Sequence, residues 1–191
     1  MVVNEADAAV ENRILESSCA TQQMIRTSRS QVIDSPPSEV WPWLVQMGQG
    51  RGGFYSYTWL ENLLGCEMVN ADRILDEYQS LRVGDEVPLH PTAQPLEVLE
   101  VSPPSHLCLG QRISRGKSLV AKWTWDFRVE LHQDQGVHES KRSILEVETR
   151  IWLPNFCLRW GLGLPIRLGH SLMEAKMLRG IRSRVEKNQS T

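Results

Sequence analysis

The sequence predicts an α+β fold in which a curved antiparallel sheet is wrapped around a long C-terminal helix, with two short helices after the first strand. Three observations predict it. A β-rich segment at residues 24–33 is followed directly by helical patterns. Short strand patterns separated by turn residues begin at Asp85, and the chain closes with one long helical stretch at residues 164–187.

The first helix is expected to follow a proline pair. Ser35 precedes Pro36 and Pro37, and a serine N-cap with proline in the first turn is a frequent helix start. Apolar residues then recur at the spacing of one helix face: Val40, Trp43, Leu44 and Met47. We therefore expect a short, buried helix directly after the first strand.

The segment GQGRGG at residues 48–53 matches the dinucleotide-binding spacing G-x-G-x-x-G, and Asp72 follows at about the distance of that fold's ribose-binding acid. The fingerprint requires a strand before the glycines and a helix whose N-terminus receives the phosphates. Here a helix precedes them, and the next helical pattern, which Trp59, Leu60, Leu63 and Leu64 indicate, begins too late. We interpret the segment as a side-chain-free bend that leads to Tyr55 and Tyr57.

The second half of the chain predicts strands and then a helix. Turn residues divide it into DEVPLH, LEVLEV, HLCLGQRI, LVAKWTWDFRVEL and RSILEVETRIWL, and the last two alternate in polarity as antiparallel strands do. The final helix is expected to begin at Pro165, as a first-turn proline. One stripe of this helix carries Ile166, Met173, Met177, Ile181 and Arg184.

Composition and charge are those of an ordinary globular protein. The 191 residues are 41% hydrophobic and 23% charged, and a net charge of −2 provides no general attraction to nucleic acid. We expect a polar, flexible lead-in at residues 1–23 and a single ligand-binding domain at residues 24–191. The cysteines are scattered, and no signal-peptide or membrane-spanning pattern is present, which favours a cytoplasmic protein without a transmembrane segment.

A family resemblance covers residues 24–187. The segments PPSEVWPWLVQMGQGRGGFYSYTWLENLLG, NADRILDEYQSLRVGDEVPLHP and MEAKMLRGIRSR resemble the START-like superfamily, also called SRPBCC, in a bacterial branch. Polyketide cyclases, Bet v 1-like plant proteins and lipid-transfer domains belong to this superfamily. The resemblance implies a helix-grip fold with a deep cavity between the sheet and the C-terminal helix. Thr58 stands where related sequences usually have Asp, and NFCLRWGLGLP before the last helix is particular to this chain.

Such a cavity would be lined by inward strand residues, the loop after the glycines and one face of the last helix. The candidate ligand-binding residues are Tyr55, Tyr57, Trp59, Trp123, Trp125, Met173 and Met177. Core packing is the competing interpretation for the tryptophans and methionines. A tyrosine beside the glycines could instead orient a polar group of the ligand or donate a proton.

Four residues are candidates for acid/base chemistry: Tyr57, Asp72, Arg73 and Glu148. Asp72 and Arg73 form a charged pair that either pins a loop or presents a guanidinium to an anion. Glu148 shares a strand face with Glu146 and Arg150, and is a buried ionisable group only if that face points inward. If it points outward, these residues form a solvated edge.

Other catalytic and binding patterns are weak. The five histidines show no metal-like clustering, and GHSLM lacks the final glycine of the hydrolase elbow G-x-S-x-G. We expect neither a metal nor an organic cofactor. The last helix is rich in cations, which is typical of a solvated helix face or, alternatively, of a weak contact with a membrane or a carrier protein.

The sequence therefore leads to one functional hypothesis and two alternatives. The first is binding of a small, largely apolar ligand, such as a polyketide, lipid or isoprenoid-like compound. The second is a cofactor-free cyclase, aromatase or dehydratase that uses acid/base residues of the pocket. The third is a regulatory or stress-response module that acts through its surface.

Overall fold

The computed structural model describes residues 24–115, 118–132, 142–152 and 156–188. Six strands form one antiparallel sheet in the order β1-β6-β5-β4-β3-β2. Their bounds are β1 Met24–Ile33, β2 Glu86–Val87, β3 Leu96–Ser102, β4 His106–Arg115, β5 Ser118–His132 and β6 Arg142–Trp152. The helices are α2 Pro37–Val45, α3 Thr58–Leu63 and α4 Phe156–Asn188, with a 3-10 turn at Asp76–Tyr78.

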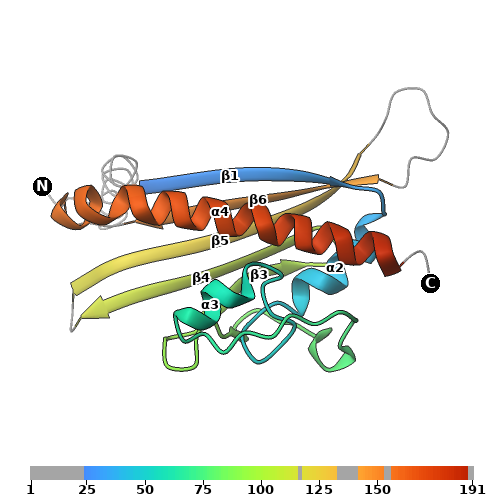
Figure 1. The fold of residues 1–191 in the computed structure, drawn as a ribbon, viewed down its shortest axis with the longest axis horizontal. Helices are drawn as coiled ribbons and strands as arrows, with labels where there is room; N and C mark the ends of the chain where they lie inside the picture. Colours follow the sequence, from blue (N-terminus) through green and yellow to red (C-terminus); the bar gives the residue numbers. More distant parts are fainter. Residues whose placement is uncertain (1–23, 116–117, 133–141, 153–155, 189–191) are drawn as a thin grey trace, which may run out of the picture.

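The predicted fold class is confirmed. Figure 1 shows α4 running across one face of the sheet, with α2 and α3 on the same side. The two short helices follow β1 as expected, and the long helix comes last. The predicted lead-in at residues 1–23 lies outside the described residues.

Strand register separates the two faces of the sheet. Trp125 of β5 lies opposite Leu109 of β4 and Thr149 of β6, and all three are buried. Because neighbouring residues of a strand point to opposite faces, Glu148 belongs to the other face, opposite Asp126. The face that carries Trp125 and Thr149 is therefore the one that packs against α4.

Two predicted helix starts are wrong. Pro36, not Ser35, is the N-cap of α2, and within the described chain the buried Ser35 hydroxyl has no hydrogen-bond partner. Ser35 lies one residue too early to reach the first free N–H groups of the helix. The last helix begins at Phe156, so Pro165 lies inside the helix and not in its first turn.

The glycine segment forms a tight, hydrogen-bonded loop. Gly48 and Gly53 exchange backbone hydrogen bonds in an isolated antiparallel bridge. Gly53 has φ of +77°, and a Cβ atom there would collide with Asn70, whose side-chain oxygen accepts the Tyr55 N–H at 2.7 Å. The loop thus needs glycine for its conformation and for close packing against the 69–71 segment.

Close approach also explains a glycine in the last helix. A Cβ atom at Gly180 would collide with the backbone carbonyl of Tyr55. Nearby, Arg184 donates to the carbonyl oxygen of Ala71 at 2.7 Å, and its guanidinium lies 4.9 Å from the centre of the Tyr55 ring. These contacts fasten the last third of α4 to the loop that follows α2.

Candidate functional site

An apolar cavity of about 190 Å³ lies between the sheet, the segment 54–68 and α4. Its walls come from β5, from the residues around α3, from Leu89 and from the first described turns of α4. The lining residues are Phe54, Ser56, Glu61, Cys66, Met68, Leu89, Trp123, Trp125, His170, Met173, Glu174 and Met177. The set is mostly apolar, but it includes two carboxyl groups and an imidazole.

The aromatic wall of the cavity is formed by β5 and its neighbours. The rings of Trp123 and Trp125 are stacked with centroids 5.9 Å apart, and Phe54 packs against Trp125 at 5.7 Å. His170 meets both indoles edge-on, at 5.8 and 6.0 Å. Within the described part of the chain, neither indole N–H has a hydrogen-bond partner, although both nitrogens are buried.

Glu61 brings an unpaired carboxyl group to the cavity. The residue is only 2% exposed, and neither carboxyl oxygen has a partner among the described residues. Burial raises the pKa of Glu61, because a charged carboxylate is poorly solvated there. Burial also raises the pKa of the Cys66 thiol, and the nearby carboxyl group of Glu61 raises it further.

Glu174 is buried as well, but it is well supported. The Thr149 hydroxyl donates to Oε1 at 2.5 Å, and the Thr27 hydroxyl donates to Oε2 at 3.2 Å. Nδ1 of His170 lies 3.3 Å from Oε1, one helical turn away. Burial alone would raise the pKa of Glu174, but the interactions with His170, Thr149 and Thr27 outweigh it and lower the pKa.

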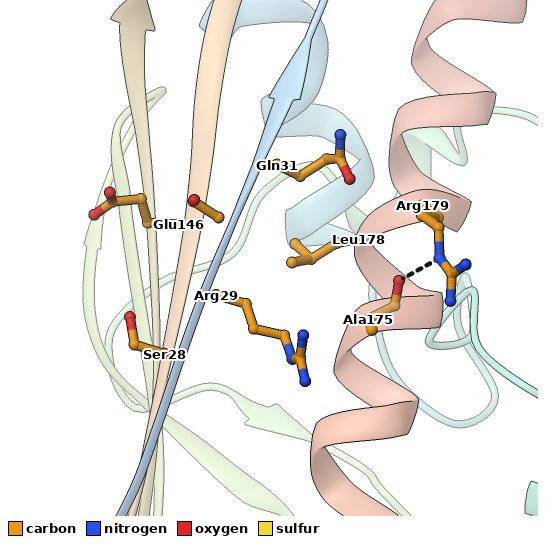
Figure 2. A pocket seen from close by; sticks show the side chains of 8 residues that line it. Ser28, Arg29, Gln31, Glu146, Ala175, Leu178 and Arg179 are labelled. Carbon is orange, nitrogen blue, oxygen red and sulfur yellow. Dashed lines mark hydrogen bonds between the residues drawn. The ribbon is translucent and has the colours of Figure 1, made fainter.

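A second hollow, of about 420 Å³, lies between β1 and α4 and has a polar lining. Figure 2 shows Arg29 extending from β1 toward α4, while Arg179 folds along its own helix and donates to the carbonyl oxygen of Ala175 at 2.9 Å. The guanidinium of Arg29 donates to the hydroxyl of Ser171. This hollow does not suit an apolar molecule, so the cavity beside Trp125 is the stronger candidate.

No protein-family model matches the sequence, and no curated protein matches it. Solved structures do match. The chain is similar to the di-domain ARO/CYC StfQ from the steffimycin biosynthetic pathway, with a TM-score of 0.52, 11% identity, and coverage of 100% of this chain and 64% of that chain. The chain therefore has the helix-grip α+β fold.

Two further matches have lower scores. Protein NE0264 from Nitrosomonas europaea has a TM-score of 0.49 and 12% identity, with coverage of 87% of this chain and 97% of that chain. A norcoclaurine synthase from Thalictrum flavum has a TM-score of 0.46 and 10% identity, with coverage of 87% and 96%.

The helix-grip cavity contains four of the expected ligand-binding residues: Trp123, Trp125, Met173 and Met177. Tyr55, Tyr57 and Trp59 are not among its lining residues. The Tyr57 ring is half-buried, with Nζ of Lys176 5.7 Å from its centre, and Trp59 is 68% exposed.

Tyr55 is a core residue of the helix-grip fold. Its hydroxyl donates to the carbonyl oxygen of Trp43 at 3.1 Å and accepts from Nε2 of Gln46 at 2.8 Å. Burial raises the pKa of the phenol. The hydrogen bonds therefore fix Tyr55 between α2 and the glycine loop, rather than at the rim of the cavity where we expected it.

The four expected acid/base residues also lie away from the cavity lining. Asp72, whose side chain is 91% exposed, pairs with Arg184 at 2.9 Å instead of with its neighbour Arg73. Arg73 is exposed and contributes its backbone carbonyl to Nε2 of Gln46 at 3.2 Å. Among the described residues, Tyr57 makes no hydrogen bond with either Asp72 or Arg73.

Glu148 lies on the outer face of the sheet, but its side chain is only 11% exposed, so it is neither a cavity residue nor part of a solvated edge. Arg26 lies 2.5 Å and Arg150 2.6 Å from its carboxylate. Burial opposes ionisation, but the hydrogen bonds from Arg150 and Arg26 lower the pKa of Glu148. On the same face, His106 bridges Asp126 at 3.0 Å and Glu100 at 3.2 Å.

The cations of α4 mostly contact the protein itself. Lys176 lies over Tyr57, Arg182 pairs with Glu186 at 2.7 Å, and Arg184 pairs with Asp72. The contact with a membrane or carrier protein stays a prediction. No helix in the described ranges is long and apolar enough to cross a membrane. Among those residues, no group of three or more His, Cys, Asp or Glu could hold a metal ion.

Sequence reasoning missed the two carboxyl groups and the imidazole of the cavity. Glu61 was hidden because Trp59, Leu63 and Leu64 set the apparent apolar face of α3, yet all three side chains are exposed. His170 and Glu174 carried a usable signal. They are spaced i, i+4 in the helix that also carries Met173 and Met177, so all four project toward the same side.

Proposed function

We propose that this chain binds a small, largely apolar molecule, such as a polyketide, lipid or isoprenoid-like compound, in the cavity between β5, the segment around α3, and α4. The observation that carries the proposal is the cavity itself. It combines an apolar aromatic wall with buried polar atoms on Glu61, Trp123 and Trp125 that have no partner within the described residues. Apolar pockets with a few polar groups are typical of small-molecule sites.

The polar atoms favour a ligand over a filled core. Leaving a buried donor or acceptor unpaired costs about 1–3 kcal/mol. Four residues of one cavity share that cost here, because Nδ1 of His170 is also without a hydrogen-bond partner among the described residues, and a ligand with matching groups would reduce it. A surface-acting regulatory module has no need of such a cavity, so this arrangement supports the binding hypothesis over that alternative.

The size of the cavity limits the ligand. Drug-sized ligands occupy pockets of about 300–1,000 Å³, whereas this cavity measures about 190 Å³. The ligand, or the part of it that enters, should therefore be the size of one or two fused rings. The stacked indoles of Trp123 and Trp125 offer a flat surface suited to such rings.

Equilibrium dialysis against an extract of small metabolites and lipids, with mass spectrometry of the retained compounds, tests the proposal. The wild-type chain should enrich one compound or a related set. Met173→Trp should abolish the enrichment, because Met173 lines the cavity and the indole would fill it. Leu172→Trp is the matched control, since the neighbouring Leu172 is 52% exposed. Equal enrichment by wild type and Met173→Trp would rule out this cavity as the site.

A second candidate is a cofactor-free enzyme of the cyclase, aromatase or dehydratase kind. The specific observation in its favour is that Glu61, His170 and Glu174 all line the same apolar cavity. StfQ, an ARO/CYC protein, shows that this fold occurs in a biosynthetic pathway. Turnover would have to depend on these cavity residues rather than on Tyr57, Asp72, Arg73 or Glu148, which lie elsewhere.

A further inference from the structure

The cavity holds two carboxyl groups in opposite environments. Glu61 is buried without a partner among the described residues, while Glu174 accepts hydrogen bonds from Thr149 and Thr27 and lies 3.3 Å from His170. Burial raises the pKa of Glu61, and the partners of Glu174 lower its pKa against the effect of burial. Two carboxyl groups whose pKa values are driven apart at one site are a common mark of separate acid and base roles.

His170 is oriented by this arrangement. Its Nδ1 is buried, has no hydrogen-bond partner among the described residues and lies 3.3 Å from Oε1 of Glu174, an ion-pair distance at which the carboxylate favours a proton on Nδ1. Nε2 then carries the free lone pair, and it takes part in no hydrogen bond within the described part of the chain. The edge-on contacts with Trp123 and Trp125 hold the ring at the cavity wall. An imidazole supported by a carboxylate in this way is suited to act as a general base.

The other unpaired groups are donors. A protonated Glu61 offers one O–H, and the indoles of Trp123 and Trp125 each offer one N–H. These three buried donors would be satisfied by an acceptor oxygen on the ligand, and the aromatic wall would pack against a flat, apolar ring. A small aryl ketone has both features. An organic cation would satisfy Glu61 alone and leave both indole N–H groups without an acceptor.

We propose that Glu61 and His170 are the acid and the base that enolise a small aryl ketone in this cavity. The proposal rests on the proposed function, namely that the cavity binds a small apolar molecule. Nε2 of His170 takes a proton from the carbon next to the carbonyl group, and the electron pair of the broken C–H bond forms the C=C bond. The carbonyl oxygen takes the proton of Glu61.

The products of this step are an enol, an imidazolium and the Glu61 carboxylate, so atoms and charge balance without an oxidant or a cofactor. Glu174 stabilises the imidazolium across the 3.3 Å contact. Reversal of the step returns a proton to carbon. In D₂O the returned atom is deuterium once the acidic positions of Glu61 and His170 have exchanged with solvent. The reaction can therefore be followed without a net chemical change.

Acetophenone is a suitable probe because it is one ring with one carbonyl group. The loss of its methyl proton signal in D₂O at neutral pH, followed by NMR, should be at least tenfold faster with the wild-type chain than in buffer. Glu61→Gln and His170→Phe should each reduce the added rate at least tenfold. Saturation-transfer NMR on the same samples reports whether acetophenone still binds to each variant.

Matched controls lie outside the cavity. Glu97→Gln changes an exposed glutamate of β3, and His106→Phe changes a histidine of the outer face; both should exchange acetophenone at the wild-type rate. Wild-type exchange rates in Glu61→Gln and His170→Phe would overturn the acid/base proposal while leaving ligand binding intact. Binding of benzylamine but not acetophenone would also overturn it, by assigning Glu61 to a cation. The dialysis experiment with Met173→Trp tests the binding function separately.

Discussion

The hydroxyl of Thr149 donates a 2.5 Å hydrogen bond to Oε1 of Glu174, and this bond joins the middle of β6 to α4. Both residues are buried, and Glu174 also lines the cavity. One contact thus has two effects. It fastens the long helix to the sheet, and it keeps a carboxylate ionised beside His170 in an apolar site.

Thr149→Val should destabilise the fold by about 1–3 kcal/mol, because Val keeps the shape of Thr but removes the hydroxyl that donates to a buried carboxylate. Urea unfolding, followed by tryptophan fluorescence and by circular dichroism, measures the change. Thr124→Val is the control. Thr124 lies in β5 on the opposite face and is half-buried, so its replacement should change the free energy of unfolding by less than about 0.5 kcal/mol. Equal effects of the two substitutions would contradict a supporting role for Thr149.

Glu61→Gln should stabilise the protein at neutral pH and not at acid pH. The folded-state pKa of Glu61 is raised above its unfolded value, so the folded state binds the extra proton between the two pKa values. Stability therefore falls as pH rises from the unfolded pKa to the folded pKa, and stays lower above it. Gln keeps the shape without the charge and removes this loss.

Thermal unfolding at pH 4 and at pH 8 measures this effect. In a chain of this size, each kcal/mol of added unfolding free energy should raise the melting temperature by about 2–4 °C. Glu97→Gln, at an exposed position, should show no such difference between the two pH values. A lower melting temperature for Glu61→Gln at pH 8 would mean that the ionised carboxylate is stabilised by a partner, against the arrangement described above.

The sheet and the long helix were predictable because their signals are local. Alternation along β5 and β6 places Trp125, Phe127 and Val147 on one face, and the register then brings them together in the core. The family resemblance added the cavity between sheet and helix. Four of the six phenylalanine, tryptophan and methionine residues of the cavity lining could be named in advance for the same reason, since strand and helix periodicity fix which side chains share a face.

The segment between the glycines and β2 was less predictable, because tertiary contacts decide its burial. In α3 the acidic Glu61 is buried and the apolar Trp59 is exposed, which reverses the pattern that the sequence favours. Tyr55 likewise turns into the core because Gln46 and the carbonyl group of Trp43 satisfy its hydroxyl. Such long-range hydrogen bonds leave no periodic signal in the sequence.

Glu148→Gln should reduce stability without affecting ligand retention. The hydrogen bonds from Arg150 and Arg26 lower the folded-state pKa of Glu148. The ionised Glu148 therefore stabilises the fold above its unfolded-state pKa, and this stabilisation is lost as pH falls through the folded-state pKa. We expect a loss of about 1 kcal/mol at pH 7, the scale of a partly screened ion pair, and a smaller loss at pH 3. Urea unfolding at both pH values checks the stability, and dialysis against the extract checks retention. Lost retention would place Glu148 at the binding site, contrary to its position on the outer face.

Two glycines of α4 should respond in opposite directions to replacement by alanine. A Cβ atom at Gly180 would collide with the backbone of Tyr55, so Gly180→Ala should force α4 away from the glycine loop and cost at least about 2 kcal/mol. Gly169 is exposed, and a Cβ atom there meets nothing within 4 Å, so Gly169→Ala should stabilise the helix by about 0.5–1 kcal/mol. Because both substitutions have the same intrinsic effect on helix propensity, the difference between their free energies of unfolding isolates the contact with Tyr55. Equal and favourable effects at both positions would show that α4 does not approach the loop as closely as Gly180 requires.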